Sequence, residues 1–438
     1  MCARSADPVR PDAVGADGSA APSADTVDSP AGPPTDAARE PVIVLARRTA
    51  FGRRNGVFAH TRAEDLLAPV LNAVVSGGGV SPAAIDDVII GNAAGGGGNV
   101  ARLAALTAGL PDSVPGLTID RQCGSGLEAI VLACRLVAAG AGDLYLAGGV
   151  ESCSTAPLRA HRLTSSAGQP DFFDRVRFAP DSIGDPDMGV AAENVADRYG
   201  ISRQRQDAFA LRSHRLAATA AATAAAVPAP EIVPLPTEAG PVFVDEGPRP
   251  GLTEALLARF APVFRPGGTV TAGNSCADAD GAVVVLVTSR RRARELGLTG
   301  WLSFVDAAVT GTDPNFLGIA GAEAARLVLL RQGLTGADLA RIEFNEAFAA
   351  QVLASLDLLG VAEEHANREG GALALGHPFG ASGALLVLRL LQQCRAAATP
   401  GDAALAAVSI AGGLGVAALF RWEQSLSSEA AGVERLSR

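Results

Sequence analysis

The chain has 438 residues, of which 48% are hydrophobic and 19% are charged, so it can bury apolar cores in two or three domains. Its formal net charge is -10 at pH 7, and all 36 basic residues are arginine. Because nucleic acids and anionic membranes are polyanions, this charge argues against either as the main partner. Six irregularly spaced cysteines, in a chain too large to need staples, predict neither a metal site nor disulfides, but a reducing, cytoplasmic compartment.

The two ends of the chain lack the apolar side chains that a packed core requires. Residues 1–40 consist mainly of Ala, Pro, Asp and Ser, with almost no bulky apolar groups. They predict a disordered tail, because they contain neither a core-forming pattern nor the hydrophobic segment of a signal peptide. Residues 425–438 are predicted to form a second tail.

The folded part begins with an alternation of strands and a helix. Residues 41–45 and 85–90 are short apolar runs bounded by arginines or by Gly and Asn, which is typical of buried strands. Between them, residues 63–75 place their leucines and valines at helical spacing. The order strand, helix, strand indicates an α/β domain.

A second unit of this kind follows Cys123. The residues Gly124-Ser125-Gly126 form a turn of small side chains, an apolar helical stretch continues to residue 139, and a strand is expected at 144–147. Cys123 is therefore expected directly before the start of a helix.

The same pattern returns near the C-terminus and indicates an internal repeat. His377 precedes small residues at 380–383, a helix and a strand at 404–410. An asparagine lies about thirty residues upstream of each reactive residue, at Asn92 and at Asn345. Two similar α/β halves are predicted, and because strand ends and helix starts of such halves gather in one crevice, the reactive residues should share a site.

Residues 158–266 interrupt the α/β pattern. They are more charged than the flanking sequence, with a helix predicted at 203–225 and a Pro-rich stretch after it. This region is interpreted as a loop domain inserted between the halves.

An uncharged run at 403–420 is long enough to raise the question of a membrane-spanning helix. Its glycines at 412, 413 and 415 and its central Ser409 favour a different structure. Two buried strands joined by a turn are predicted there.

Three side chains could carry chemistry. Cys123 stands where the free amides and positive dipole end of a helix would lower the pKa of a thiol, which favours a nucleophile over a buried structural cysteine. His377 lies in a rigid turn with Pro378, where an imidazole could accept the thiol proton; the alternative is an ordinary core or surface histidine. Asn345 follows an apolar strand, and its amide could hold a water or a substrate oxygen or could simply cap a turn.

The remaining histidines and two helical cysteines have structural interpretations. His214 is expected on the solvated face of the helix at 203–225, and His60, His161 and His365 in loops. Cys134 and Cys394 lie in apolar helical stretches and are expected in the core.

Taken together, the ordered motifs over residues 41–422 resemble the thiolase family. The motifs that carry the resemblance are Arg48-Thr49-Ala50-Phe51-Gly52, Asp120-Arg121-Gln122-Cys123-Gly124-Ser125-Gly126, Gly148-Gly149-Val150-Glu151-Ser152, Ala192-Glu193-Asn194, the segment 268–274, Asn345-Glu346-Ala347-Phe348 and the segment 371–383. The resemblance implies a five-layered αβαβα fold of two similar α/β halves with an inserted loop domain that binds coenzyme A. It also implies a homodimer or homotetramer.

The resemblance also implies roles for individual residues. Cys123 would carry the acyl group, His377 would activate it, and Asn345 would hold a water that polarises the second thioester. The backbone amides of Cys123 and Ala411 would form an oxyanion hole. Arg249 would face the nucleotide end of coenzyme A, which is a substrate carrier and not a bound cofactor.

Several positions depart from the family pattern. Ser409 replaces a cysteine that exchanges the α-proton of the second acyl group, and a hydroxyl is a far poorer acid than a thiol. Cys276 replaces a serine that faces pantetheine. Cys153 and Leu317 replace methionines near the acyl pocket. The segment 320–324 replaces a Gly-Pro-x-Pro-Ala turn, and together these changes predict a reshaped acyl pocket.

Three functions follow from this pattern. The first is Claisen-type formation or cleavage of a carbon–carbon bond through acyl-Cys123, with a decarboxylating donor as one way to bypass Ser409. The second is transfer of the acyl group to oxygen, nitrogen or water. The third is a noncatalytic subunit, against which the intact Cys123 and His377 count. The carrier of the acyl group can be coenzyme A or an acyl carrier protein.

The predicted organisation places every segment in one of five parts. These are a tail at 1–40, an N-terminal half at 41–157 completed by 267–298, a CoA-binding loop domain at 158–266, a C-terminal half at 299–424, and a tail at 425–438.

Overall fold

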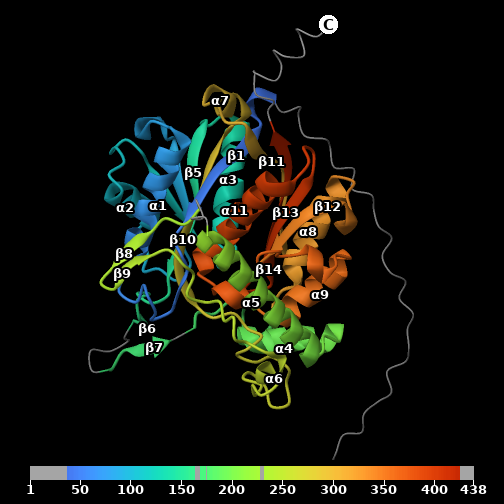
Figure 1. The fold of residues 1–438 in the computed structure, drawn as a ribbon. Coiled ribbons are helices and arrows are strands. Elements are labelled where there is room, and N and C mark those ends of the chain that lie inside the picture. The colour runs from blue at the N-terminus through green and yellow to red at the C-terminus, as the bar shows by residue number, and fades with distance from the viewer. Residues whose placement is uncertain (1–36, 163–167, 174, 227–230, 425–438) are drawn as a thin grey trace, which may run out of the picture. The chain divides into compact units, whose positions relative to one another are not determined.

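The computed structural model describes residues 37–162, 168–173, 175–226 and 231–424 (Figure 1). The predicted tail at 425–438 lies outside the described residues, as does most of the tail at 1–40. Residues Ala37–Arg39 at the end of that tail form a 3-10 helix.

Two sheet halves of the same design form the framework. In the N-terminal half the strand order is β4-β3-β5-β10-β1, and in the C-terminal half it is β12-β13-β14-β11. The strands are β1 (Pro41–Arg48), β3 (Asp87–Gly91), β4 (Gly116–Ile119), β5 (Leu144–Ser152), β10 (Ala279–Ser289), β11 (Gly300–Gly311), β12 (Leu339–Phe344), β13 (Ala403–Ile410) and β14 (Leu414–Gln424). β3 runs parallel to β5 as β12 runs parallel to β13, and β10 and β14 are the antiparallel equivalents. The predicted pair of similar α/β halves is confirmed.

The halves meet edge to edge in one continuous sheet. β1 and β11 pair antiparallel, with Val42 opposite Ser303 and Ile43 opposite Leu302. The two-residue strand β2 (Gly52–Arg53) adds to β10. β10 follows the loop region in sequence but pairs with β1 and β5, so the chain returns to the N-terminal half after 158–266.

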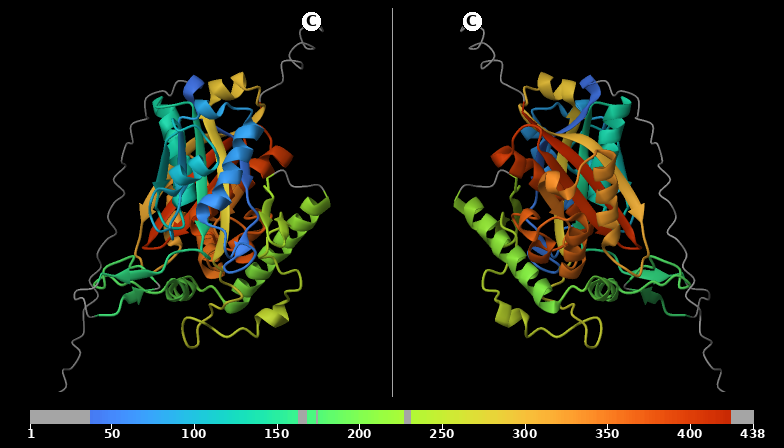
Figure 2. Two further views of the ribbon diagram at one scale, coloured as in Figure 1. Left: turned by 90° about the vertical axis from the view of Figure 1, so that its left-hand side faces the viewer. Right: turned by 90° about the vertical axis from the view of Figure 1, so that its right-hand side faces the viewer.

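The two sheet halves are two of the five layers of the fold, and helices make the other three (Figures 1 and 2). α1 (Ala63–Gly78) and α2 (Val100–Thr107) cover one outer face, and α8 (Ile319–Arg331) and α9 (Ala349–Leu359) cover the other. α3 (Ser125–Ala139) and α11 (Phe379–Ala397) pack against each other and against both halves of the sheet. The largest apolar core surrounds these two middle helices, and it contains Cys134 and Cys394 as predicted.

Two long apolar segments of the chain, which by composition alone raise the question of a membrane span, lie inside the protein. Among the described residues, one helical segment, Gln122–Ala139, is long and apolar enough by composition to cross a membrane. It contains the middle-layer helix α3, whose apolar side chains pack inside the protein. The run at 403–420 forms β13 and β14 joined by a turn, as predicted.

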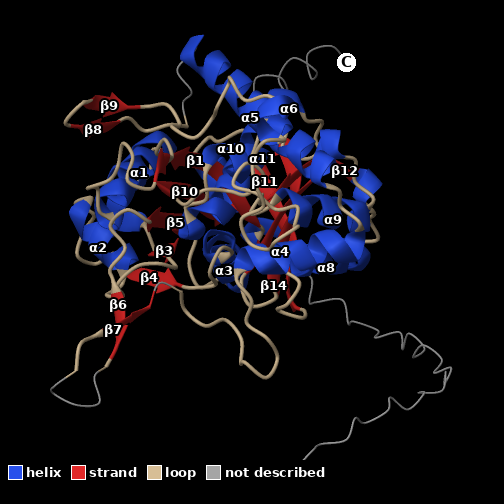
Figure 3. Cartoon of the chain, turned by 90° about the horizontal axis from the view of Figure 1, so that it is seen from below, coloured by secondary structure: helices blue, strands red, loops and turns tan. Residues whose placement is uncertain are grey.

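The region between the halves lies at one end of the sheets (Figures 1 and 3). Its elements are β6 (Arg159–His161), β7 (Asp171–Phe173), α4 (Met188–Tyr199), α5 (Arg203–Ala226), β8 (Leu235–Thr237), β9 (Gly240–Val242) and α6 (Glu254–Leu257). The remaining helices are α7 (Arg290–Glu295), α10 (Ala372–Leu375), and the 3-10 helices Pro82–Ala84, Gly336–Asp338 and Glu363–His365.

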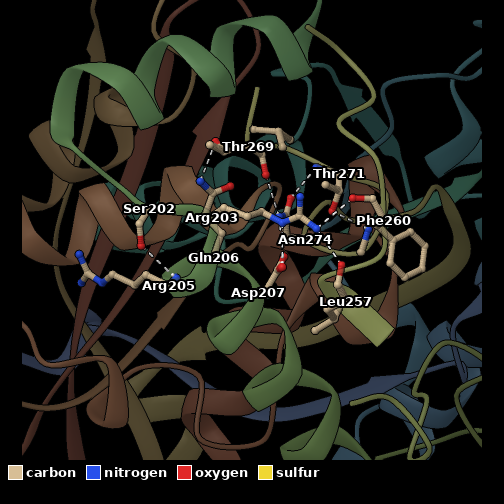
Figure 4. A network of polar contacts seen from close by, with 12 residues as sticks. Ser202, Arg203, Arg205, Gln206, Asp207, Leu257, Phe260, Thr269, Thr271 and Asn274 are labelled. Atoms are coloured by element: carbon tan, nitrogen blue, oxygen red, sulfur yellow. Dashed lines mark hydrogen bonds and ion pairs between the residues drawn. The ribbon is translucent and has the colours of Figure 1, made fainter. Parts of the chain in front are cut away.

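A buried polar network attaches this region to the sheet framework (Figure 4). Arg203 of α5 pairs with Asp207 at 2.7 Å, and Asp207 accepts a hydrogen bond from Asn274 Nδ2 at 2.9 Å. The backbone of Asn274 in turn accepts a hydrogen bond from Ala349 N of α9. The loop region is thereby tied to the segment that leads into Cys276.

The first turns of α3 and α11 touch. A Cβ atom on Gly126 would lie 2.5 Å from the Gly380 oxygen and 3.0 Å from the Ala384 nitrogen. Since protein interiors are close-packed, neither helix can move away without opening the core. Glycine at 126 is therefore required for the contact between the helices.

We expect Gly126→Ala to lower the free energy of unfolding by roughly 1–3 kcal/mol, because the added methyl overpacks this contact. Denaturant-induced unfolding measures the change. Gly251→Ala is the control, since a Cβ at Gly251 would have no neighbour within 4 Å. Equal stability of the Gly126 variant and the control would contradict the close contact.

Candidate active site

The turn that carries Cys123 is fixed by its own hydrogen bonds. Gln122 has a left-handed φ of 46°, which costs energy for a residue with a side chain. Gln122 N donates to Asp120 Oδ1 at 2.7 Å, and Arg121 N donates to Ser125 Oγ at 2.8 Å. Ser125 Oγ donates back to the Gln122 oxygen at 2.6 Å. These bonds hold Cys123 directly before α3.

The predicted lowering of the Cys123 pKa is wrong. Burial raises the pKa of the Cys123 thiol to about 12 and outweighs the two backbone amides that favour the thiolate, those of Ala411 and of Cys123 itself. The sequence showed the helix start but not the packing around this partly buried side chain. The thiol is neutral at pH 7 and needs a base, and the two amides predicted as an oxyanion hole are the groups that partly offset the rise of its pKa.

His377 is a buried base with one free nitrogen. Its Nδ1 lies 2.6 Å from Ser382 Oγ, and that hydroxyl donates to the Pro378 oxygen at 3.0 Å. Because a hydroxyl has one proton, Ser382 must accept from Nδ1–H, which leaves the lone pair on Nε2. Nε2 has no hydrogen-bond partner among the described residues, and burial lowers the pKa of His377 to about 4. The imidazole is therefore neutral at pH 7.

Several contacts bring the Cys123 and His377 turns together. Each residue lies two positions before its helix, and the two helices touch at Gly126 and Gly380. The backbone nitrogen of His377 donates to the Ala277 oxygen at 2.8 Å, next to Cys276. The two turns therefore lie at one contact between the helices, and the shared site itself stays a prediction.

The two equivalent asparagines differ in their hydrogen bonding. Asn92 Nδ2 donates to the Val150 oxygen at 3.0 Å and to Glu151 at 2.8 Å. Asn345 is equally placed after β12, but its Nδ2 is buried and has no partner among the described residues. A buried, unpaired amide is costly, so Asn345 is a donor available to a water or a substrate oxygen.

Ser409 lies at the end of β13 with its hydroxyl already engaged. Its Oγ donates to the Gly318 oxygen at 2.6 Å and accepts from Gln351 Nε2 at 3.4 Å. The side chain is buried, and its hydroxyl proton is donated to a backbone carbonyl oxygen. A carbonyl oxygen has no proton of its own, so this hydrogen bond does not let Ser409 act as a proton shuttle.

The residues predicted to shape the pocket separate into two groups. Leu317 and Cys276 pack in one apolar cluster with Phe348, and Cys276 N donates to the Ala347 oxygen at 3.0 Å. Burial, with Cys123 as the next cause, raises the pKa of Cys276. Cys153 is buried outside that cluster, where burial also raises its pKa. The structure therefore brings Leu317 to Cys276 but not to Cys153.

A cleft connects Arg249 with the segments beside Cys276 and His377. It is lined by Arg53, His214, Arg249, Phe260, Ser275 and Gly376, among others. The prediction that His214 lies on a solvated helix face is wrong, because α5 packs that face against the Arg249 segment. His214 is 7% exposed, and its Nδ1 accepts a hydrogen bond from Arg249 N at 3.2 Å.

Two positioning groups were missed from the sequence. Ser382 lay inside a recognised motif, five residues after His377, but the direction of its hydroxyl depends on the turn. Gln351 follows the Asn345 motif at helical spacing, and only the fold brings its amide to Ser409.

We expect His214→Gln to reduce the acid sensitivity of folding. Burial, Arg249 and Arg53 lower the pKa of His214 to about 4. The unfolded histidine takes up a proton below about pH 6.5, which the folded one does not, so stability is present above that pH and is lost as the pH falls. Between pH 7 and pH 5 the parent should lose about 2 kcal/mol more than the variant.

Denaturant unfolding at the two pH values measures this difference. His60→Gln, at an exposed histidine, is the control and should behave as the parent does. The same loss in the His214 variant as in the parent would contradict the buried, neutral imidazole.

Comparison with known proteins agrees with the fold. Residues 41–291 match the family described as Thiolase, N-terminal domain, and residues 299–422 match Thiolase, C-terminal domain. A protein of Staphylococcus epidermidis named "Putative acetyl-CoA C-acetyltransferase VraB" is 45% identical over 390 residues, covering 88% of this chain and 99% of its own. Its Staphylococcus aureus namesake is 46% identical over 382 residues, covering 86% and 98%.

A solved structure has the same fold. The crystal structure of the Bacillus anthracis acetyl-CoA acetyltransferase superposes with a TM-score of 0.81 at 35% identity, covering 87% of this chain and 98% of that one. With both family domains matched in order, the chain belongs to the thiolase family.

Proposed function

We propose that this enzyme transfers an acyl group from a coenzyme A thioester to Cys123 and then makes or breaks a carbon–carbon bond with a second thioester. The observation that carries the proposal is a pair of buried atoms, His377 Nε2 and Asn345 Nδ2, that have no hydrogen-bond partner within the described ranges. They accompany a neutral thiol at which two backbone amides point. The names of the relatives, acetyl-CoA C-acetyltransferases, support the same reaction class.

The first half-reaction is acyl transfer to sulfur. The Cys123 thiol gives its proton to His377 Nε2 as the sulfur attacks the thioester carbonyl carbon. The amides of Cys123 and Ala411 donate to the oxyanion, and each such donor contributes about 3–4 kcal/mol in comparable sites. The carbon–sulfur bond to coenzyme A then breaks, and the leaving thiolate takes the proton from His377.

The second half-reaction needs a carbanion next to a thioester carbonyl. Asn345 would hold a water that donates one hydrogen bond to that carbonyl oxygen and stabilises the enolate, and His377 Nε2, unprotonated again after the first half-reaction, would accept the other hydrogen bond of this water. The family's proton-exchanging cysteine is Ser409 here, and an alkoxide is scarcely present near neutral pH. A donor that loses carbon dioxide forms the carbanion without a base, so we propose a decarboxylating donor as the better second substrate.

The engaged Ser409 hydroxyl also favours a second candidate. Transfer of the acyl group from Cys123 to an alcohol, an amine or water requires no carbanion. The same acyl-enzyme would then make an ester or an amide or be hydrolysed. The acceptor distinguishes the two candidates.

The carrier and the assembly are further parts of the proposal. The arginine-lined cleft that ends beside His377 suits the phosphates of coenzyme A.

Thiolases commonly form oligomers, and we propose a homodimer or homotetramer. The cytoplasmic location stays a prediction from cysteine usage.

We expect Cys123→Ala to abolish acyl-enzyme formation, since it removes the thiol whose pKa the amides of Cys123 and Ala411 influence and which His377 is proposed to deprotonate. Intact-protein mass spectrometry after incubation with a panel of acyl-CoAs measures the adduct. Cys134→Ala, at a buried thiol of α3, is the control and should keep the parent's adduct. Persistent labelling of the Cys123 variant would contradict the assignment.

The same experiment separates the candidate functions. Malonyl-type thioesters, plain thioesters, alcohols and amines are offered to the labelled protein. Release as a β-keto thioester, with one carbon dioxide per product for malonyl-type donors, supports the decarboxylating reaction. Release only to water, alcohol or amine supports the second candidate.

We expect Ser409→Cys to increase α-proton exchange of acetyl-CoA by at least about tenfold, because a thiol of pKa near 8.5 gives and takes protons far more readily than a hydroxyl. Deuterium incorporation from heavy water, followed by mass spectrometry, measures it. Ser409→Ala provides the matched control without an ionisable group. No gain in a folded cysteine variant would count against this role for position 409.

A further inference from the structure

We propose that Glu151 is a positioning residue whose buried carboxylate links the turn of Cys123 to the turn of His377. Glu151 is 1% exposed at the end of β5. Its Oε1 accepts from Asn92 Nδ2 at 2.8 Å and from Ala94 N at 3.1 Å. Its Oε2 accepts from Ala93 N at 3.0 Å and from Gly380 N at 3.0 Å. All four partners are N–H donors, which favour the ionised carboxylate and oppose the burial that raises the pKa of Glu151 to about 7.

On one side, the bonds lead to Cys123. Asn92, which donates to Glu151, also donates with its backbone nitrogen to the Ile119 oxygen at 3.1 Å. Ile119 is the last residue of β4, and the turn that begins at Asp120 follows it directly. The carboxylate thus holds the loop against which the Cys123 turn is anchored.

On the other side, the bond leads to His377. Gly380 lies in the first turn of α11, three residues beyond His377. Ser382, which holds His377 Nδ1, belongs to the same turn. Because a carboxylate is favourable at a helix N-terminus, Glu151 also stabilises the start of α11 in this place.

The surrounding backbone leaves little space for another group to take over this link. A Cβ on Gly149 would lie 1.8 Å from the Gly380 oxygen, and one on Gly380 would lie 2.6 Å from the Gly91 oxygen. The strand ends and the helix start are therefore in direct contact around the carboxylate. A shift of the first turn of α11 would move His377 relative to Cys123.

Glu151→Gln tests this role because it keeps the size of the side chain but turns one acceptor into a donor facing an N–H. The readout is the rate of Cys123 alkylation by iodoacetamide at pH 7, which requires the thiol proton to move to His377. We expect a loss of at least about tenfold, since a misplacement of about 1 Å can cost 10²-fold. The dissociation constant for coenzyme A should stay within about twofold, because its cleft is built from other segments.

A double-mutant cycle separates positioning from a general loss of structure. In a His377→Ala background the Glu151→Gln change should alter the alkylation rate by less than about twofold, because there is no base left to position. Asp86→Asn is the matched control. Asp86 accepts from Asp143 N and Leu144 N at the opposite end of the β5 region, and its loss should leave the rate unchanged.

Two outcomes would overturn the inference. One is a rate within about twofold of the parent in the folded glutamine variant, and the other is an equal loss with and without His377. If Glu151→Gln does not fold, Asn92→Ala removes one donor and keeps the carboxylate, and the same dependence on His377 is required of it. The inference rests on the proposed roles of Cys123 and His377, but alkylation needs no acyl-CoA, so failure of the proposed acyl transfer remains distinguishable.

Discussion

The first turns of α3 and α11 are in contact at Gly126 and Gly380, and the site depends on this contact. Each half of the chain supplies one reactive residue two positions before one of these helices. Because the helices meet at equivalent points of two similar halves, the turns that carry a thiol and an imidazole distant in sequence lie at one helix contact. Burial then keeps both neutral, as the raised pKa of Cys123 and the lowered pKa of His377 show.

The chemistry arises where the two halves stop being equivalent. Asn92 has both amide protons engaged by Val150 and Glu151, whereas the amide nitrogen of Asn345 has no partner among the described residues. A satisfied amide contributes to structure, while an unsatisfied buried one is a cost that a bound water or substrate removes. The repeated architecture therefore supplies two similar positions, of which one serves the fold and the other is free for a ligand.

The sequence predicted the two similar α/β halves because periodicity and small-residue turns are local signals, whereas the five layers were implied only by the family resemblance. Strands, helices, and the two turns of Cys123 and His377 lie where these signals placed them. Properties that depend on tertiary packing were not accessible. The start of a helix just after Cys123 was visible, but not the packing that raises the pKa of its thiol. The helical position of His214 was visible, but not the segment that covers it.

The same distinction applies to position 409. The sequence shows a hydroxyl at a position where the family resemblance implies a thiol, and only the structure shows that the hydroxyl has a donor and an acceptor suited to it. A thiol is a weaker donor than a hydroxyl and would leave the Gly318 oxygen less satisfied. The surroundings of position 409 therefore suit the hydrogen bonding of a serine hydroxyl and not only its smaller size. A site that commits this proton to the backbone while keeping His377 and Asn345 free is suited to reactions that need acyl transfer and oxyanion stabilisation but not a second acid–base group at position 409.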